Sequence, residues 1–282
     1  MTTISLIVPV YNHIDFLSKC LASVKNQTKL PDELIIADDG SEEEVLSFLK
    51  EFRKTVSFPI IFVQQQHKKF RLAKSRNNAI KNSSGDYLIF CDQDKIMTRE
   101  LIQNFYDLRN EKNFFMAHFI NTTEEQGKHI NENNIADFSF LDLLETEQKK
   151  YIRKRVYKDK LYYYLHKIYL KPFASKLIGG NFAIFRDTLL KINGFDEMYQ
   201  GWGHEDDDIS NRLYRTGITG LTVPEENYAV HLYHPFYFTH GKKLDNQDYY
   251  DRRKKEIRAG DVKCKYGIDN PLENEEIKVI KL

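Results

Sequence analysis

The sequence predicts an α/β fold in which a mostly parallel, Rossmann-like sheet is flanked by helices. Short apolar runs lie in the first hundred residues, and stretches with helical spacing separate them. The four runs are Ile4 to Val8, Leu34 to Ala37, Ile60 to Val63 and Tyr87 to Cys91. Strands that alternate with helices are typical of βαβ units, whose strands run parallel and whose ligands bind at the carboxyl ends of the strands.

Polar and acidic residues follow three of these runs. They are Pro9-Val10-Tyr11-Asn12, Asp38-Asp39-Gly40-Ser41 and Asp92-Gln93-Asp94. Each segment alone is ordinary turn chemistry. Because the carboxyl ends of parallel strands meet at one edge of the sheet, the three segments together predict a ligand site at that edge.

The composition is that of a globular protein. The chain has 282 residues, of which 41% are hydrophobic, and a net charge of +1, so it lacks the basic excess that is usual in nucleic-acid-binding proteins. Three widely spaced cysteines, Cys20, Cys91 and Cys264, favour a reducing compartment and structural roles. No apolar stretch approaches ~18 residues. We therefore expect a cytoplasmic protein, with peripheral attachment to the inner face of the membrane as a further option.

A cluster of four consecutive acidic residues follows a tryptophan that is flanked by glycines. The segment is Gly201-Trp202-Gly203-His204-Glu205-Asp206-Asp207-Asp208, and helical spacing continues from it to Gly217, so the carboxylates should begin a helix. Like charges this close cost free energy unless a metal, a cation or sugar hydroxyls compensate them, which indicates a binding or reactive site. The alternative is an acidic helix start that only complements the helix dipole.

The order of these segments resembles the nucleotide-sugar glycosyltransferases of the GT-A fold, family 2. The first two turns are similar to that family's uridine-binding turns, Phe70 to Asn77 resembles its nucleotide-contacting helix start, and Asp92-Gln93-Asp94 looks like its Asp-x-Asp metal motif. From Gly179 to Gly217 the chain resembles the C-terminal part of β-1,4-galactosyltransferases and of bacterial capsule or chondroitin-type synthases.

The resemblance implies a GT-A fold with a C-terminal acceptor-side subregion, divided into four parts. They are a nucleotide-sugar-binding half (1–120), a basic and aromatic helical insertion (121–178), a catalytic and acceptor-side half (179–245) and a charged C-terminal tail (246–282). The tail should contain a charged helix that ends near Gly260.

The resemblance also implies which residues bind the UDP-sugar donor. Asp39 would recognise the uracil or the ribose, Tyr11 would stack on the base, and Asp92 would reach the ribose or the outer shell of a metal ion. The full set is Pro9, Tyr11, Asn12, Asp39, Phe70, Arg71, Arg76, Asp92 and Gln93.

A divalent cation is implied too, because the leaving diphosphate's charge must be neutralised. By the resemblance Asp94 binds Mn²⁺ or Mg²⁺, and imidazole ligands suit Mn²⁺ better. His231 and His234 are the candidates for further ligands, and His234 is preferred because His231 replaces a methionine of the galactosyltransferase pattern. Residues three apart in a strand face opposite sides, so both histidines can bind only if the chain turns, as Pro235 allows.

For the acceptor, the resemblance makes Asp206 the general base, and an in-line attack assisted by a base would invert the anomeric centre. Trp202 would stack on a sugar face, while Glu205 and Asp207 would bind hydroxyl groups. The substrate-binding set is Gly180, Trp202, Gly203, Glu205 and Asp207. His204 stands where the galactosyltransferases carry a glycine in a mobile loop, so their loop closure is not transferred to this chain.

The segment from Lys149 to Lys176 departs from the family pattern, because it is dense in lysine, arginine and tyrosine at near-helical spacing. Such a helix could lie at an anionic membrane surface or bind a phosphorylated, lipid-linked acceptor. It could equally be a solvated helix whose tyrosines pack on the sheet.

The expected function is therefore an inverting, metal-dependent glycosyltransferase. It would move a hexose or N-acetylhexosamine, with Gal or GalNAc favoured, from a UDP-sugar to a glycan or lipid-linked glycan acceptor in surface polysaccharide or glycoconjugate synthesis. Two alternatives stay open. A sugar nucleotidyltransferase would need a glycine-rich, basic loop after the first strand, which Pro9 to Asn12 lacks. A non-catalytic carbohydrate-binding protein would use the Trp-acidic cluster only to hold sugar.

Overall fold

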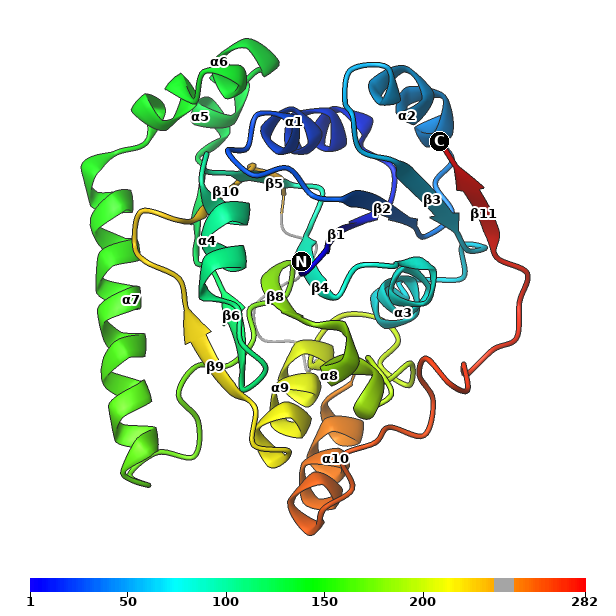
Figure 1. Cartoon of the computed structure of the whole chain (residues 1–282), viewed down its shortest axis with the longest axis vertical. Coiled ribbons are helices and arrows are strands. Elements are labelled where there is room, and N and C mark those ends of the chain that lie inside the picture. Colours follow the sequence, from blue (N-terminus) through cyan, green and yellow to red (C-terminus); the bar gives the residue numbers. More distant parts are fainter. Residues whose placement is uncertain (236–245) are drawn as a thin grey trace.

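A large mixed sheet forms the centre of the protein (Figure 1). The computed structural model describes residues 1–235 and 246–282. Its eight-stranded sheet has the order β11-β3-β2-β1-β4-β8-β6-β9. The strands are β1 (Ile4–Val10), β2 (Glu33–Asp38), β3 (Ile60–Gln64), β4 (Tyr87–Cys91), β6 (Asn113–Met116), β8 (Asn181–Phe185), β9 (Thr219–Thr222) and β11 (Lys278–Lys281).

The sheet is mostly parallel, as predicted. The pairs that β1 forms with β2 and β4 are parallel, and so are the β2–β3 and β6–β9 pairs. Only β8 and β11 pair antiparallel with their neighbours. The four predicted strands are all present, and three of them are longer than predicted by one or two residues.

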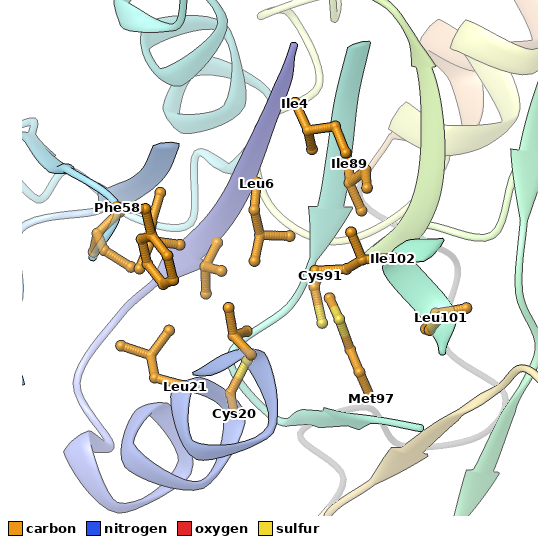
Figure 2. Packing of buried hydrophobic residues seen from close by; sticks show 14 of the residues in the cluster. Ile4, Leu6, Cys20, Leu21, Phe58, Ile89, Cys91, Met97, Leu101 and Ile102 are labelled. Atoms are coloured by element: carbon orange, nitrogen blue, oxygen red, sulfur yellow. The ribbon is translucent and has the colours of Figure 1, made fainter. Parts of the chain in front are cut away.

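Helices cover both faces of this sheet. The helices of the described residues are α1 (Ile14–Lys25), α2 (Val45–Arg53), α3 (Leu72–Asn82), α4 (Leu101–Leu108), α5 (Glu124–His129), α6 (Glu132–Ala136), α7 (Thr146–Lys167), α8 (Arg186–Lys191), α9 (Glu205–Arg215) and α10 (Gln247–Ala259), with a 3-10 helix, η1 (Ser139–Leu143). Every residue of β1 is buried, which a central strand with both faces covered requires. One face packs on α1, α2 and α4 (Figure 2), and the other packs on α3, α8 and α9.

A second, three-stranded sheet carries part of the site. It consists of β5 (Lys95–Met97), β10 (Ala229–His231) and β7 (Phe119–Asn121), in the order β5-β10-β7. The antiparallel pairing of β5 and β10 sets His231 opposite Lys95. This register brings the late segment around residue 231 next to the turn that follows β4.

The predicted charged helix of the C-terminal tail is present as α10, and Gly260 ends it in a left-handed conformation with φ of 111°. The cysteines Cys20, Cys91 and Cys264 are buried and form no disulfide. Among the described residues, no helix has both the length and the apolar character that crossing a membrane requires. The predicted boundary at residue 245 lies outside the described residues, and the other predicted boundaries stay predictions.

Candidate active site

The ends of β1 and β2 and the loop after β3 form one polar region. The buried Asp39 carboxylate accepts hydrogen bonds from Gln65 Nε2 at 2.5 Å and from the Arg71 backbone N–H at 3.3 Å. Burial raises the pKa of Asp39 above its ordinary value. The Tyr11 ring stacks on His67, with ring centroids 4.4 Å apart. One face of the Tyr11 ring is therefore covered by His67, a residue that the sequence analysis did not single out.

Three further predicted residues lie at the end of β1 or contact the loop that follows it. Pro9 is buried inside the strand. Asn12 Oδ1 accepts a hydrogen bond from the backbone N–H of Glu42 at 2.9 Å. The Gln93 side chain accepts from the Tyr11 N–H at 3.1 Å and donates to the Tyr11 carbonyl at 3.2 Å. The side chains of Asn12 and Gln93 thus hold the backbone of this loop in place.

The Arg71 side chain lies apart from the other predicted site residues. Its guanidinium pairs with Glu275 at 2.9 Å and Glu273 at 3.2 Å, and the side chain is buried. The backbone N–H of Arg71 donates to Asp39, and its guanidinium also donates to the Gln66 carbonyl in the loop after β3. Phe70 is partly exposed, and its carbonyl accepts a hydrogen bond from the Gly201 N–H at 2.9 Å, which links the start of α3 to the tryptophan loop.

An alternating row of charges crosses the carboxyl ends of the strands. Arg76 is only 1% exposed, and its guanidinium reaches Asp206 at 3.0 Å and Asp92 at 3.3 Å. Lys95 continues the row, with Nζ 2.7 Å from Asp92 and 3.6 Å from Asp94. Burial alone would raise the pKa values of Asp92 and Asp94, but Lys95 and their other charged neighbours outweigh burial and hold both below the ordinary value. Asp92 and Asp94 therefore stay ionised although they are half-buried.

A possible metal centre lies at one end of this row. Ligand atoms of Asp94, His231 and His234 all lie within 4.8 Å of one another. The Asp94 Oδ2 atom is 3.3 Å from His231 Nε2 and 3.4 Å from His234 Nε2. Because β10 ends at His231, the chain leaves the strand there and His234 can turn back to the same carboxylate. The structure thus brings the three predicted ligands together.

The residues at this centre fit a divalent cation. The other Asp94 oxygen, Oδ1, is buried and has no hydrogen-bond partner. Lys95 Nζ lies 3.6 Å from this oxygen, beyond hydrogen-bond distance, and a bound cation would satisfy it more directly. One carboxylate and two imidazoles suit Mn²⁺ better than Mg²⁺, which prefers oxygen ligands. Three protein ligands would also leave coordination positions for oxygens of a substrate.

Two glycines let the backbone pass between the carboxylates of the row. A side-chain carbon added at Gly179 would lie 1.7 Å from Asp206 Oδ2, and one added at Gly180 would lie 1.7 Å from Asp92 Oδ2. Gly180 also has a positive φ of 73°, and its carbonyl accepts a hydrogen bond from the Asp92 N–H at 3.0 Å. Only glycine fits at either position without displacing a carboxylate.

The first two acidic residues of α9 face the row of charges. Asp206 pairs with Arg76, and Glu205 lies close enough to Asp206, Arg76 and Asp92 to feel their charges. Burial, and after it the Asp206 charge, raises the pKa of Glu205 to about 7. Burial also raises the pKa of Asp206, although Arg76 opposes the rise.

The last two acidic residues of α9 point elsewhere. Asp207 pairs with Lys176 at 2.7 Å and with His204 at 3.2 Å. Asp208 is fully buried and pairs with Arg212 at 2.6 Å, which anchors the helix in the core. Of the cluster, only Glu205 and Asp206 are therefore placed for chemistry at the strand ends.

The loop before α9 is fastened to α10. His204 has a φ of 73°, its ring stacks on Tyr250 with centroids 4.2 Å apart, and its Nε2 lies 3.0 Å from Gln247 Oε1. The Gly203 carbonyl accepts a hydrogen bond from Asn246 at 2.9 Å. Trp202, which lies between Gly201, bonded to the Phe70 carbonyl, and Gly203, is 54% exposed. His204, the residue that departs from the galactosyltransferase pattern, thus holds this loop against α10.

Replacing Glu205 by glutamine should change how stability depends on pH. The pKa of Glu205 is about 4.5 when unperturbed and about 7 in the folded protein, so the folded state binds this proton more tightly between those values. Folding stability contributed by this group is therefore lost as pH rises from about 4.5 to about 7. In urea titrations of metal-free protein, the stability of Glu205→Gln relative to wild type should rise across this window and level off above it. A difference that does not change with pH would contradict the assignment.

Comparisons with known proteins show which family the sequence matches. Residues 5–192 match the family model described as Glycosyl transferase family 2, and residues 159–235 match the model described as the N-terminal domain of galactosyltransferase. An uncharacterized glycosyltransferase of Bacillus subtilis is 30% identical over 265 residues, covering 82% of this chain and 65% of the relative. Chondroitin synthase of Escherichia coli is 28% identical over 233 residues, covering 76% of this chain and 32% of the synthase. The chain thus spans less than two thirds of the length of either relative.

A solved structure of GalNAc-T7 with UDP, GalNAc and Mn²⁺ superposes with a TM-score of 0.58 at 16% sequence identity. The match covers 92% of this chain and 51% of that protein. At this identity the likeness shows a shared fold alone, and that fold is the GT-A fold expected from the sequence.

Proposed function

The chain belongs to glycosyl transferase family 2, and on this premise we propose that it is an inverting, metal-dependent glycosyltransferase. The proposed donor is a UDP-hexose or UDP-N-acetylhexosamine, and the proposed acceptor is a glycan of surface polysaccharide or glycoconjugate synthesis. The observation that carries the proposal is the row of charges with Asp206 at one end and the Asp94, His231 and His234 cluster at the other. A base and a cation site at opposite ends of one short row are what sugar transfer from a diphosphate needs.

Each end of the row would have its own task. Asp94, His231 and His234 would hold Mn²⁺, which when bound would neutralise charge on the leaving diphosphate. Asp206 would take the proton from the acceptor hydroxyl on the opposite face of the sugar. Arg76, bonded to the Asp206 carboxylate at 3.0 Å, would hold that carboxylate in position.

Glu205 and Trp202 would bind the sugars beside the base, as the resemblance implies. The Asp207 carboxylate is paired with Lys176 and His204, so it would contact a substrate hydroxyl only together with these two residues. Gly180 and Gly203 would contribute by their backbone, since Gly180 lies against Asp92 and Gly203 ends the tryptophan segment.

Three comparisons support a galactose-type donor and a glycan acceptor. The galactosyltransferase model covers the segment that contains Trp202, Asp206 and both candidate histidine ligands. A relative is named chondroitin synthase, and the superposed GalNAc-T7 binds UDP and GalNAc.

A panel of UDP-sugars tests the proposal. Purified protein with Mn²⁺ should release UDP from UDP-galactose or UDP-N-acetylgalactosamine faster than from the glucose analogues, and chelation by EDTA should stop the release. Formation of a nucleotide sugar from UTP and a sugar phosphate would instead favour the nucleotidyltransferase. Sugar binding without turnover across glycan acceptors would favour a non-catalytic binding protein.

Asp39 should control nucleotide affinity and base selection. Replacing Asp39 by alanine removes a charged acceptor at the end of β2, and a hydrogen bond to a charged group contributes about 1.5–3 kcal/mol. We therefore expect UDP affinity to fall by roughly 10- to 100-fold and discrimination against CDP to weaken. Calorimetric titration of UDP and CDP measures both effects, and the melting temperature shows whether the fold is intact. UDP binding as tight as that of wild type would place the uridine pocket elsewhere.

A further inference from the structure

Helix α7 presents two different faces. Its inner face holds Ile152 and Val156, both buried, and Asp159, which accepts hydrogen bonds from Thr222 at 2.6 Å and pairs with His118 at 2.7 Å. Figure 1 shows α7 along one side of the molecule, where its opposite face meets no other described element. The inner contacts attach the helix to the rest of the described chain.

The outer face carries a row of apolar and aromatic side chains. Tyr157 is 72% exposed, Leu161 is 48% exposed, Tyr164 is 66% exposed and Ile168 is 61% exposed. The spacing of these residues, four, three and four, puts them on one side of a helix. Tyr169 and Leu170 extend the row past the end of α7 and are exposed as well. Contiguous apolar side chains of this kind usually mark an interaction surface.

Positive charge surrounds this row. The whole chain has 42 basic and 41 acidic residues, of which ten and one, respectively, lie in residues 149–176. That segment thus has a formal charge of +9, and the rest of the chain has a charge of −8. Among the described residues, salt bridges reach only three of the ten cations, Lys150, Arg153 and Lys176. The charge is therefore concentrated on one surface and largely uncompensated there.

We propose that this surface, formed by the outer face of α7 and residues 168–170, docks on an anionic lipid membrane. A bilayer interface accepts both features at once: tyrosine, leucine and isoleucine side chains enter the headgroup boundary, while lysines reach up to the phosphates. A soluble polyanion would neutralise the charge but leave the apolar row in water. A second copy of this chain would bring one +9 segment against another, which disfavours that occupant.

The docking surface leads directly into the proposed acceptor side of the active site. From Leu170 the chain runs through Lys176, which pairs with Asp207, to Gly179, which lies against Asp206. Membrane docking does not rest on the proposed reaction, because it needs only the charge and the exposed side chains of this surface.

Sedimentation with lipid vesicles tests the proposal without any activity measurement. The intact chain should bind vesicles that contain phosphatidylglycerol, bind pure phosphatidylcholine vesicles much less, and release as salt is raised. The triple variant Lys154→Glu, Lys158→Glu, Lys160→Glu should lose more than about tenfold in affinity. The matched control is Lys50→Glu, Lys255→Glu, Arg258→Glu, which makes the same change in net charge at exposed positions elsewhere and should keep its binding.

A second variant separates a membrane from a soluble polyanion. Tyr157→Ser, Leu161→Ser, Tyr164→Ser removes the part of the apolar row that lies on α7 and keeps every charge, so vesicle binding should fall while binding to soluble polyphosphate should not. Melting temperatures show that each variant is folded. Three results would overturn the proposal: no binding of wild type to anionic vesicles, equal loss in the matched control, or unchanged vesicle binding after removal of the apolar row.

Discussion

Replacing Asp206 by asparagine is expected to lower the maximal rate by about 10²–10⁴-fold, the usual contribution of a general base. Asparagine keeps the size and much of the hydrogen bonding of aspartate but cannot accept the acceptor's proton. Arg76 bonds the Asp206 carboxylate at 3.0 Å and would still contact the amide oxygen of the variant. Binding of the UDP-sugar should therefore survive, and the loss should appear in turnover at saturating substrate.

The neighbouring acidic residues supply the controls. Asp207→Asn changes a carboxylate that already pairs with Lys176 and His204, so it should affect substrate affinity more than the maximal rate. Glu205→Gln should do the same. If Asp206→Asn kept more than about a tenth of the wild-type turnover, below the low end of a general base's contribution, and Glu205→Gln lost it, Glu205 would be the base. If all three variants stayed active, the glycosyltransferase proposal would fail.

Replacing Asp94 by alanine is expected to abolish turnover that depends on Mn²⁺. Both candidate histidine ligands approach the Asp94 carboxylate, at 3.3 Å and 3.4 Å. Its removal should cost more Mn²⁺ affinity than the roughly 10- to 100-fold that loss of a supporting residue around a metal typically costs. Calorimetric titration of Mn²⁺ measures the affinity without relying on activity.

Single histidine variants refine this experiment. His234→Ala and His231→Ala should each weaken Mn²⁺ binding, because each removes one of three ligands. His129→Ala is the matched control, since His129 is exposed on α5, pairs with Glu125 and lies outside the cluster. If Mn²⁺ stimulated turnover of Asp94→Ala as strongly as turnover of the wild type, the assignment of this metal centre would be wrong.

The strands and the start of α9 could be predicted because their signals are local. The strands β1 to β4 are buried on both faces and read as continuous apolar runs. The acidic start of α9 is followed at once by helical spacing and a glycine stop. The sequence around these residues does not, however, show that Asp207 and Asp208 point away from Asp206. Asp207 pairs with Lys176 in another segment, and Asp208 pairs with Arg212 one helical turn ahead.

The sequence analysis did not find the roles of Lys95 and His67 or the position of the Arg71 side chain. Lys95 stands beside the Asp-x-Asp motif, and only the buried position of its side chain shows that it neutralises Asp92 and Asp94. The position of Arg71 depends on Glu273 and Glu275, which lie about two hundred residues away and are brought close where β11 pairs with β3. His67 is positioned by Tyr11 and by the Asp39 carbonyl, contacts that no local pattern shows.

The Gly179-Gly180 dipeptide bears on how a mutational scan of this protein should be interpreted. Alanine at either position would place a methyl group where a carboxylate oxygen of Asp206 or Asp92 now lies. Such a scan would score both glycines as essential although neither supplies a side chain. An inactive variant at these positions would report a displaced carboxylate, so their sensitivity to substitution measures how tightly the backbone is fitted around the acids and says nothing about contact with sugar.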